Sequence, residues 1–268
     1  MRSLKNLMAE HNAHESFDVV GDVHGCLDEL LALVAELGYG VKRRREEFEV
    51  TPPQGRTLAF VGDLVDRGPA APGVLRLAMD MARAGTALYV AGNRDVELVR
   101  ALKGRVAQVS RGMARTLEQL APQPREFRAE VIRFLRGLPS HLLLDAGRLA
   151  IAHAGLKEAM QGRDSAEARA FALHGELAGG RDAESLRLRM NWAADYRGKA
   201  LVVHGHTPVA EPRWLNNTVN IDTGCVYGGH LTALRYPERE TVSIPAKAIY
   251  YAPRRTLAAN KSLERTRR

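Results

Sequence analysis

Five short polar turns in this sequence directly follow apolar runs, and each carries residues able to bind a cation or a phosphate. They are GDVHG at 21–25, GDLVDRG at 62–68, GNRD at 92–95, AHAG at 152–155 and HGHTP at 204–208. In open α/β sheets, ligands bind just beyond the carboxyl ends of the strands. Turns that each follow a strand can therefore converge on one site.

The side chains in these turns suit a pair of metal ions. The candidate ligands are Asp22, His24, Asp63, Asn93, His153 and His206. Asp22 and His24 are two residues apart on an extended turn, so both can face one ion, and the two carboxylate oxygens of Asp63 can bridge two ions. Mixed oxygen and nitrogen ligands favour manganese, with iron, zinc, cobalt or nickel as alternatives, over magnesium or calcium.

A pair of such ions has a defined chemistry. Two ions about 3.5–4 Å apart clamp the attacking and leaving oxygens of an in-line displacement at phosphorus. A water that bridges them becomes hydroxide near neutral pH, because the cations favour the charged form. Arg67, in the second turn, offers a planar fork to phosphate oxygens. Each motif alone is more often structural, but the five together predict a phosphohydrolase.

The elements that must position these turns can be read from hydrophobic periodicity. Apolar runs at 17–21, 57–62 and 86–92 are each followed by a helical segment, which indicates an α/β fold with parallel strands. The segment 104–140 lacks a strand and reads as a helical insert. Later runs at 200–205, 218–222, 230–236 and 240–245 predict strands with antiparallel pairing. We expect two packed mixed β-sheets flanked by helices.

Composition limits the remaining choices. The 268 residues carry a net charge of +8, much of it after residue 252, and are long enough for one large core. We predict a flexible tail at 1–16, a catalytic domain at 17–246 and a basic tail at 247–268. Two cysteines and no signal peptide favour a cytoplasmic protein. No apolar run spans a membrane, and a nucleotide-kinase P-loop is absent.

The five turns, in this order, resemble those of the calcineurin-like metallophosphoesterases of the phosphoprotein-phosphatase (PPP) type. The later stretches WAADYRGKALVVHGHTPVAEP and NNTVNIDTGCVYGGHLTALRYPERETVSIPA are similar to two bacterial groups within it. One is the phosphatase module of polynucleotide kinase-phosphatases, and the other is the stand-alone symmetrical diadenosine tetraphosphatases. The resemblance covers about residues 17–246 and is specific for the superfamily rather than for the substrate.

The resemblance also implies roles for individual residues. One ion would be held by Asp22, His24 and Asp63, and the other by Asp63, Asn93, His153 and His206. Arg67 and Asn93 would contact the phosphate. Asp222 would support the site from outside the ligand set. Arg197 is a further candidate phosphate contact, with a surface arginine as the alternative.

The third turn departs from the family pattern. The family has GNHD or GNHE there, and its histidine, paired with the aspartate of DRG, donates a proton to the leaving oxygen. This chain has Arg94 at that position, and arginine does not give up its proton at any useful pH. We expect Arg94 to form an ion pair with Asp66 and to act on the leaving oxygen as a fixed charge.

The leading hypothesis is a dinuclear-metal phosphohydrolase in which a metal-bridging hydroxide attacks nucleotide phosphates such as diadenosine tetraphosphate. One alternative is a phosphatase or phosphodiesterase of polynucleotide ends, which the basic tail favours. A protein serine/threonine phosphatase is another. From a different class comes a catalytically impaired regulator that binds metal or nucleotide, suggested by Arg94. The expected partner is a nucleotide or a nucleic-acid end, without a membrane, and the sequence leaves the oligomeric state open.

Overall fold

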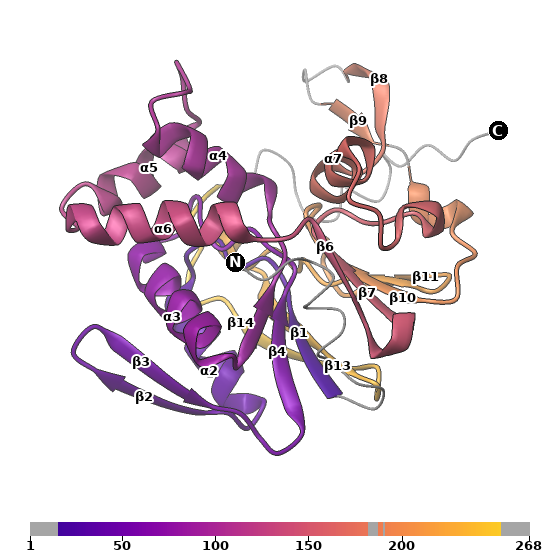
Figure 1. The fold of residues 1–268 in the computed structure, drawn as a ribbon, viewed down its shortest axis with the longest axis horizontal. Coiled ribbons are helices and arrows are strands. Elements are labelled where there is room, and N and C mark those ends of the chain that lie inside the picture. The colour runs from indigo at the N-terminus through magenta and orange to yellow at the C-terminus, as the bar shows by residue number, and fades with distance from the viewer. Residues whose placement is uncertain (1–15, 182–186, 190, 253–268) are drawn as a thin grey trace.

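The three predicted strand–helix units supply three strands of one of two five-stranded sheets (Figure 1). The computed structural model describes residues 16–181, 187–189 and 191–252. The order in the first sheet is β14 (Glu240–Pro245), β13 (His230–Tyr236), β1 (Ser16–Val20), β4 (Arg56–Phe60) and β5 (Ala87–Tyr89). β1, β4 and β5 are parallel, and the C-terminal hairpin of β13 and β14 adds antiparallel strands beside β1.

The second sheet is formed by the later part of the chain. Its order is β11 (Arg213–Leu215), β12 (Thr218–Asn220), β10 (Leu201–His204), β7 (Leu149–Ala152) and β6 (His141–Leu144). The predicted antiparallel pairing is present between β13 and β14, but it is wrong for β10 and β12, which pair in parallel. The reason is β11, which the sequence pattern did not reveal. It pairs antiparallel with β12 and so reverses the chain once more before β12 begins.

The two sheets pack face to face, as the alternation of apolar residues along their strands requires. Val19 of β1 faces the layer between the sheets, which also contains Ile151 and Val203 from the second sheet. The neighbouring Val20 points the other way, into the core beneath the helices. The mixed α/β fold with two sheets flanked by helices is therefore confirmed.

Helices cover the outer face of the first sheet. They are α2 (Leu27–Glu36), α3 (Ala71–Ala84), α4 (Asn93–Leu102), α5 (Arg111–Leu120) and α6 (Arg125–Gly137). The last two occupy the region of the predicted helical insert, and Met113 and Val131 are among the residues they bury. None of the helices within the described ranges is long and apolar enough to cross a membrane.

Shorter elements complete the fold. A hairpin of β2 (Gly40–Arg44) and β3 (Glu47–Thr51), not anticipated from the sequence, packs beside α3. Near the second sheet lie α7 (Ala166–His174), the small sheet of β8 (Leu177–Arg181) and β9 (Arg187–Arg189), and the 3-10 turn η3 (Trp192–Asp195). The 3-10 turn η4 (Cys225–Tyr227) packs instead in the core between the first sheet and its helices.

The predicted tails are described only where they adjoin the domain. Residue 16 belongs to β1, and residues 247–252 contact the domain through Glu29, whose Oε1 accepts from Lys247 N and Tyr250 Oη at 2.8 Å each. Residues 1–15 and 253–268, which include most of both predicted tails, lie outside the described residues.

Candidate metal centre

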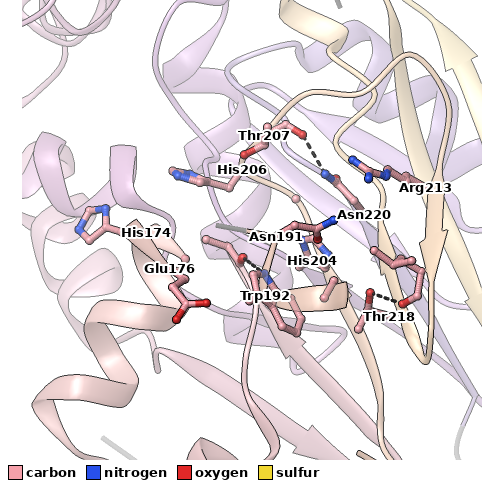
Figure 2. Close-up of a pocket in the computed structure, with 15 residues that line it drawn as sticks. His174, Glu176, Asn191, Trp192, His204, His206, Thr207, Arg213, Thr218 and Asn220 are labelled. Carbon is pink, nitrogen blue, oxygen red and sulfur yellow. Dashed lines mark hydrogen bonds between the residues drawn. The ribbon is translucent and has the colours of Figure 1, made fainter. Parts of the chain in front are cut away.

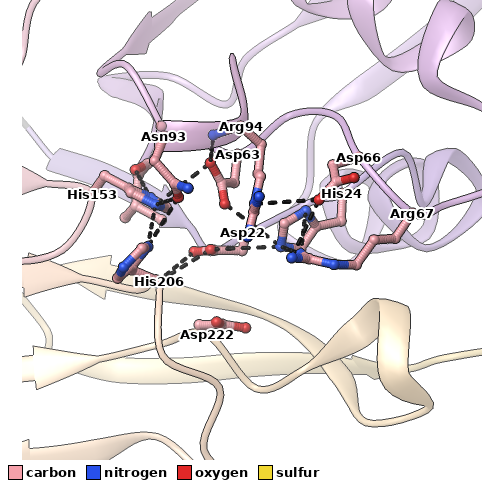
Figure 3. Close-up of polar contacts among 12 residues, drawn as sticks. Asp22, His24, Asp63, Asp66, Arg67, Asn93, Arg94, His153, His206 and Asp222 are labelled. Carbon is pink, nitrogen blue, oxygen red and sulfur yellow. Dashed lines mark hydrogen bonds and ion pairs between the residues drawn. The ribbon is translucent and has the colours of Figure 1, made fainter. Parts of the chain in front are cut away.

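The five polar turns meet where the two sheets come together (Figure 3). The turns after β1, β4 and β5 come from the first sheet, and those after β7 and β10 come from the second. Backbone hydrogen bonds join them in pairs. His24 N donates to Asp63 O at 2.8 Å, and Gly205 N donates to His153 O at 2.8 Å. The convergence expected from strand ends is present in the structure.

The backbone of these turns is strained at several non-glycine residues. Positive φ angles occur at His24 (48°), Asp63 (50°), Asp66 (84°), Arg67 (73°) and His206 (73°). This left-handed region is unfavourable for residues with a Cβ, and such strain clusters at functional sites. Here it turns side chains from different strands toward one centre.

Asp22, His24 and Asp63 form the first cluster of potential ligands. One ligand atom from each lies within 4.8 Å of the others, and all three residues are buried. His24 Nε2 is 4.0 Å from Asp22 Oδ2 and 3.7 Å from Asp63 Oδ2. His24 Nδ1 donates to Val65 O at 2.9 Å, which fixes the tautomer and leaves Nε2 as an acceptor, with Arg67 Nη1 3.0 Å from it.

A second cluster shares Asp63 with the first. It combines Asp63, His153 and His206, with ligand atoms again within 4.8 Å of one another. Asn93 Oδ1 lies 2.9 Å from His153 Nε2 and 3.0 Å from His206 Nδ1. His153 Nδ1 donates to Val61 O at 3.1 Å, so its Nε2 faces the cluster. The structure thus brings all six candidate ligands together around a shared carboxylate.

The electrostatics of the first cluster suit a bound cation. Burial raises the pKa of Asp22 well above its ordinary value, and the nearby carboxylates of Asp222 and Asp63 raise it further. Burial and the positive charge of Arg67 lower the pKa of His24 to about 3, so this imidazole is neutral. Crowded buried carboxylates beside neutral imidazoles are what a divalent ion would compensate. The residues present therefore fit metal binding.

Asp222 lies beside these ligands rather than among them. Its backbone N–H donates to Asn220 Oδ1 at 2.9 Å, and its Oδ1 accepts from Gly224 N at 3.1 Å. Asp22 accepts from His206 N at 3.2 Å, which links the first cluster to the second. Asp222 contributes negative charge close to Asp22, as its influence on the Asp22 pKa shows.

The cationic side of the site contains the predicted ion pair. Arg94 Nε lies 3.3 Å from Asp66 Oδ2, and Arg67 Nη2 lies 3.2 Å from the same oxygen. Burial raises the pKa of Asp66, although both arginines oppose the shift. Arg94 also pairs with Glu97 at 2.8 Å. The expected contact between Asp66 and Arg94 is confirmed, and it places a permanent cation beside the candidate metal ligands.

Some contacts at the site were not foreseen from the sequence. The Arg67 guanidinium lies over the rings of Tyr227 and Tyr251, at 5.6 and 5.9 Å from their centroids. Asp95 is fully buried and accepts from Leu64 N and Gly92 N at 3.0 Å each. Asp95 belongs to the GNRD turn, which the sequence had already singled out. Nothing in the sequence indicated the contacts of Arg67 with the two tyrosines.

Arg197 is engaged elsewhere. Its Nη1 donates to Ala194 O and to Tyr196 O, both at 2.8 Å, and these carbonyls belong to its own turn. The phosphate-binding role suggested for Arg197 stays a prediction without a contact to support it.

Known proteins are similar to this chain in sequence and in fold. The model of the family described as calcineurin-like phosphoesterase matches residues 16–220. Among solved structures, a candidate diadenosine tetraphosphatase is similar, with a TM-score of 0.62, 24% identity, and coverage of 88% of this chain and 98% of its own. A serine/threonine phosphatase from Saccharomyces cerevisiae has a TM-score of 0.56 at 14% identity, and the match covers 90% of this chain and 82% of that one. Both show the fold alone.

Sequence relatives are closer. The bis(5′-nucleosyl)-tetraphosphatase PrpE (asymmetrical) of Anoxybacillus flavithermus is 44% identical over 240 residues, which cover 88% of this chain and 96% of the relative. The protein of the same name from Bacillus subtilis is 40% identical over 239 residues, which cover 88% of this chain and 96% of that relative. The names of these relatives specify an asymmetrical tetraphosphatase, whereas the sequence motifs resembled those of symmetrical diadenosine tetraphosphatases. The chain belongs to the calcineurin-like phosphoesterase family and is a metal-dependent phosphohydrolase.

Proposed function

We propose that this protein hydrolyses bis(5′-nucleosyl) tetraphosphates asymmetrically, into a nucleoside monophosphate and a nucleoside triphosphate. The observation that carries the proposal is the pair of ligand clusters joined through Asp63. The similarity to relatives named for this activity supports the choice of substrate.

The proposed centre holds two divalent ions, with manganese the first choice for the mixed ligand set. One ion would lie among Asp22, His24 and Asp63, and the other would add Asn93, His153 and His206. When bound, the ions would supply positive charge to the phosphate oxygens and activate the attacking water. Hydrogen bonds to the carbonyls of Val65 and Val61 fix the ring orientations of His24 and His153, which supports this proposal.

Arg67 and Arg94 act on the phosphate in this proposal. The stacked position of Arg67 over Tyr227 limits its rotamers and presents its guanidinium beside His24, 3.0 Å from Nε2. Nearby acids, Asp63 foremost among them, raise the pKa of Arg94 although burial opposes this, so the residue stays charged. A fixed cation stabilises a negative leaving oxygen without donating a proton.

The nature of the leaving group favours nucleotides over the alternatives. A nucleoside triphosphate leaves as a stable anion and needs little protonation, whereas a serine or ribose alkoxide needs a general acid. The arginine in place of the family histidine therefore counts against a protein phosphatase and against a phosphatase of polynucleotide ends. The regulator hypothesis requires that catalysis be absent despite a full ligand set. A cytoplasmic location is part of the proposal.

A substrate panel tests the proposal. The purified chain is assayed with diadenosine tetraphosphate, p-nitrophenyl phosphate, a phosphoserine peptide and a 5′-phosphorylated oligonucleotide, with manganese and with a chelator. We expect manganese-dependent turnover that is fastest for the tetraphosphate. Faster turnover of the peptide or oligonucleotide would support the corresponding alternative. Metal binding without any turnover would support the regulator.

A further inference from the structure

A pocket opens beside the candidate metal ligand His206 (Figure 2). It is partly open, and about 530 Å³ of empty space lies within it and its mouth, solvent included. Its walls come from the end of α7, from η3 and from the strands β10 to β12. No predicted site residue apart from His206 lines this pocket.

The walls combine apolar and polar surfaces. Trp192, Ala193 and Leu215 supply apolar surface, and the Trp192 ring is held in place because its Nε1 donates to Ala154 O at 3.2 Å. Asn191, His204 and Arg213 supply polar groups. A nucleotide matches such walls, because its flat heteroaromatic base has apolar faces and a polar edge and its phosphate is negatively charged.

His204 provides the most specific sign of a ligand. It is 8% exposed, and its Nδ1 has no hydrogen-bond partner among the residues that the structure describes. Its ring packs against Trp192, with centroids 5.3 Å apart. Buried polar atoms without a partner are rare in proteins and ask for an explanation. The imidazole ring itself lines the pocket, so a ligand bound there would lie against His204.

We infer that this pocket binds one nucleoside of the substrate while the attached phosphate lies at the metal centre. The inference rests on the proposed function. Asymmetrical hydrolysis cuts the bridge one phosphate away from a nucleoside, so that nucleoside must lie next to the ions. His206 belongs both to the second ligand cluster and to the pocket wall, which gives this adjacency. Arg213 adds positive charge along the same wall.

Intrinsic fluorescence tests the pocket independently of hydrolysis. The sequence has two tryptophans, and Trp214 is 41% exposed, so Trp214→Phe leaves Trp192 as the reporter. This full-length variant is titrated with AMP and with inorganic tripolyphosphate, with and without manganese. AMP should change the fluorescence saturably, whereas tripolyphosphate should not. No response to AMP, or the same response to both anions, would overturn the inference.

Two further substitutions in that background define the contacts. His204→Phe keeps an aromatic ring and removes the ring nitrogens, so the Kd for AMP should rise about tenfold while the melting temperature does not fall. Arg213→Gln should also weaken AMP binding, but Arg239→Gln, an equal charge change at an exposed residue away from the pocket lining, should not. Equal affinity for AMP in the reporter background and both pocket variants would contradict the assignment.

The outcomes separate the pocket from the proposed function. A chain that binds AMP at Trp192 but does not hydrolyse diadenosine tetraphosphate keeps the nucleoside site and loses the proposed activity. A chain that hydrolyses the tetraphosphate without an AMP response keeps the activity and loses the pocket.

Discussion

Asp63 connects the two ligand clusters, and its neighbours determine its charge. Burial alone would raise its pKa, but His153, His24 and Arg94 lower it below the ordinary value. Its Oδ1 also accepts from Arg94 N at 2.8 Å, so the start of α4 fixes the carboxylate. The position of Arg94 thus affects the centre through its backbone, whatever its side chain does.

The side chain of Arg94 can be tested by restoring the family residue. Arg94→His should raise turnover of alkyl phosphomonoesters on the order of ten- to a hundredfold, because an imidazole can protonate an alkoxide. Turnover of p-nitrophenyl phosphate should change much less. Steady-state kinetics of both substrates gives the ratio, and Arg100→His, at an exposed residue of α4, is the control. An unchanged ratio would place Arg94 outside the leaving-group position.

At the scale of elements, α5 holds the turn that carries Asp66 and Arg67. Arg115 Nη1 donates to Arg67 O at 3.1 Å and to Tyr250 O at 3.0 Å. Gln119 donates to Gly68 O at 2.9 Å and accepts from Ala71 N at 2.8 Å. The helical insert therefore directly supports this turn, which we call the arginine turn after Arg67.

Gly112 of α5 makes this support sensitive to one methyl group. A Cβ there would overlap Asp66 Oδ1 and lie 2.7 Å from Arg67 Cγ. Gly112→Ala should cost about 1–3 kcal/mol of unfolding free energy and displace the arginine turn, lowering kcat. Urea unfolding and kinetics measure both effects. Gly40→Ala, whose Cβ would meet its nearest neighbour at 3.6 Å, is the control, and equal behaviour of the two variants would refute the packing argument.

His141 at the start of β6 gives the fold a dependence on pH. Burial lowers its pKa, and its Nε2 accepts from Gly162 N at 3.1 Å, which requires the neutral ring. In the unfolded chain the imidazole takes up a proton below its ordinary pKa of about 6.5, whereas the folded one takes it up only at a lower pH. The contribution of His141 to stability is therefore complete above that pH and is lost as the pH falls.

The test compares unfolding in urea at pH 8 and pH 5.5. His141→Gln keeps an acceptor without a titrating group, so the variant should lose less unfolding free energy than the natural chain on acidification. His230→Gln, at an exposed histidine, should behave as the natural chain does. Parallel losses in all three proteins would exclude the buried imidazole as the cause.

At the scale of the whole molecule, the site lies where two sheets meet, so its assembly requires the complete fold. The sequence predicted the site residues in the turns because each turn follows a buried strand, and such runs are visible without a structure. It did not predict the contacts of Gly112 or of Tyr227 and Tyr251 with the arginine turn, because these join segments distant in the chain. The parallel pairing of β10 and β12 was missed for a similar reason, since β11 has only three residues.

Because ligands from both sheets would share the ions, metal binding should stabilise the whole fold. At a manganese concentration a hundred times its Kd, the gain is about 2.7 kcal/mol, which should raise the melting temperature of the metal-free protein by about 5–10 °C. Calorimetry with and without manganese measures it. Asp63→Asn should lose most of the shift and Asp195→Asn, at an exposed residue, should retain it. A full shift in Asp63→Asn would contradict a shared ligand.

The products formed from diadenosine tetraphosphate test the central claim most directly. Chromatography of a manganese-dependent reaction should show AMP and ATP in equal amounts from the start, and Asp63→Asn should abolish both. ADP as the sole product would contradict asymmetrical hydrolysis. Intact substrate in the presence of bound metal would contradict the proposed activity itself.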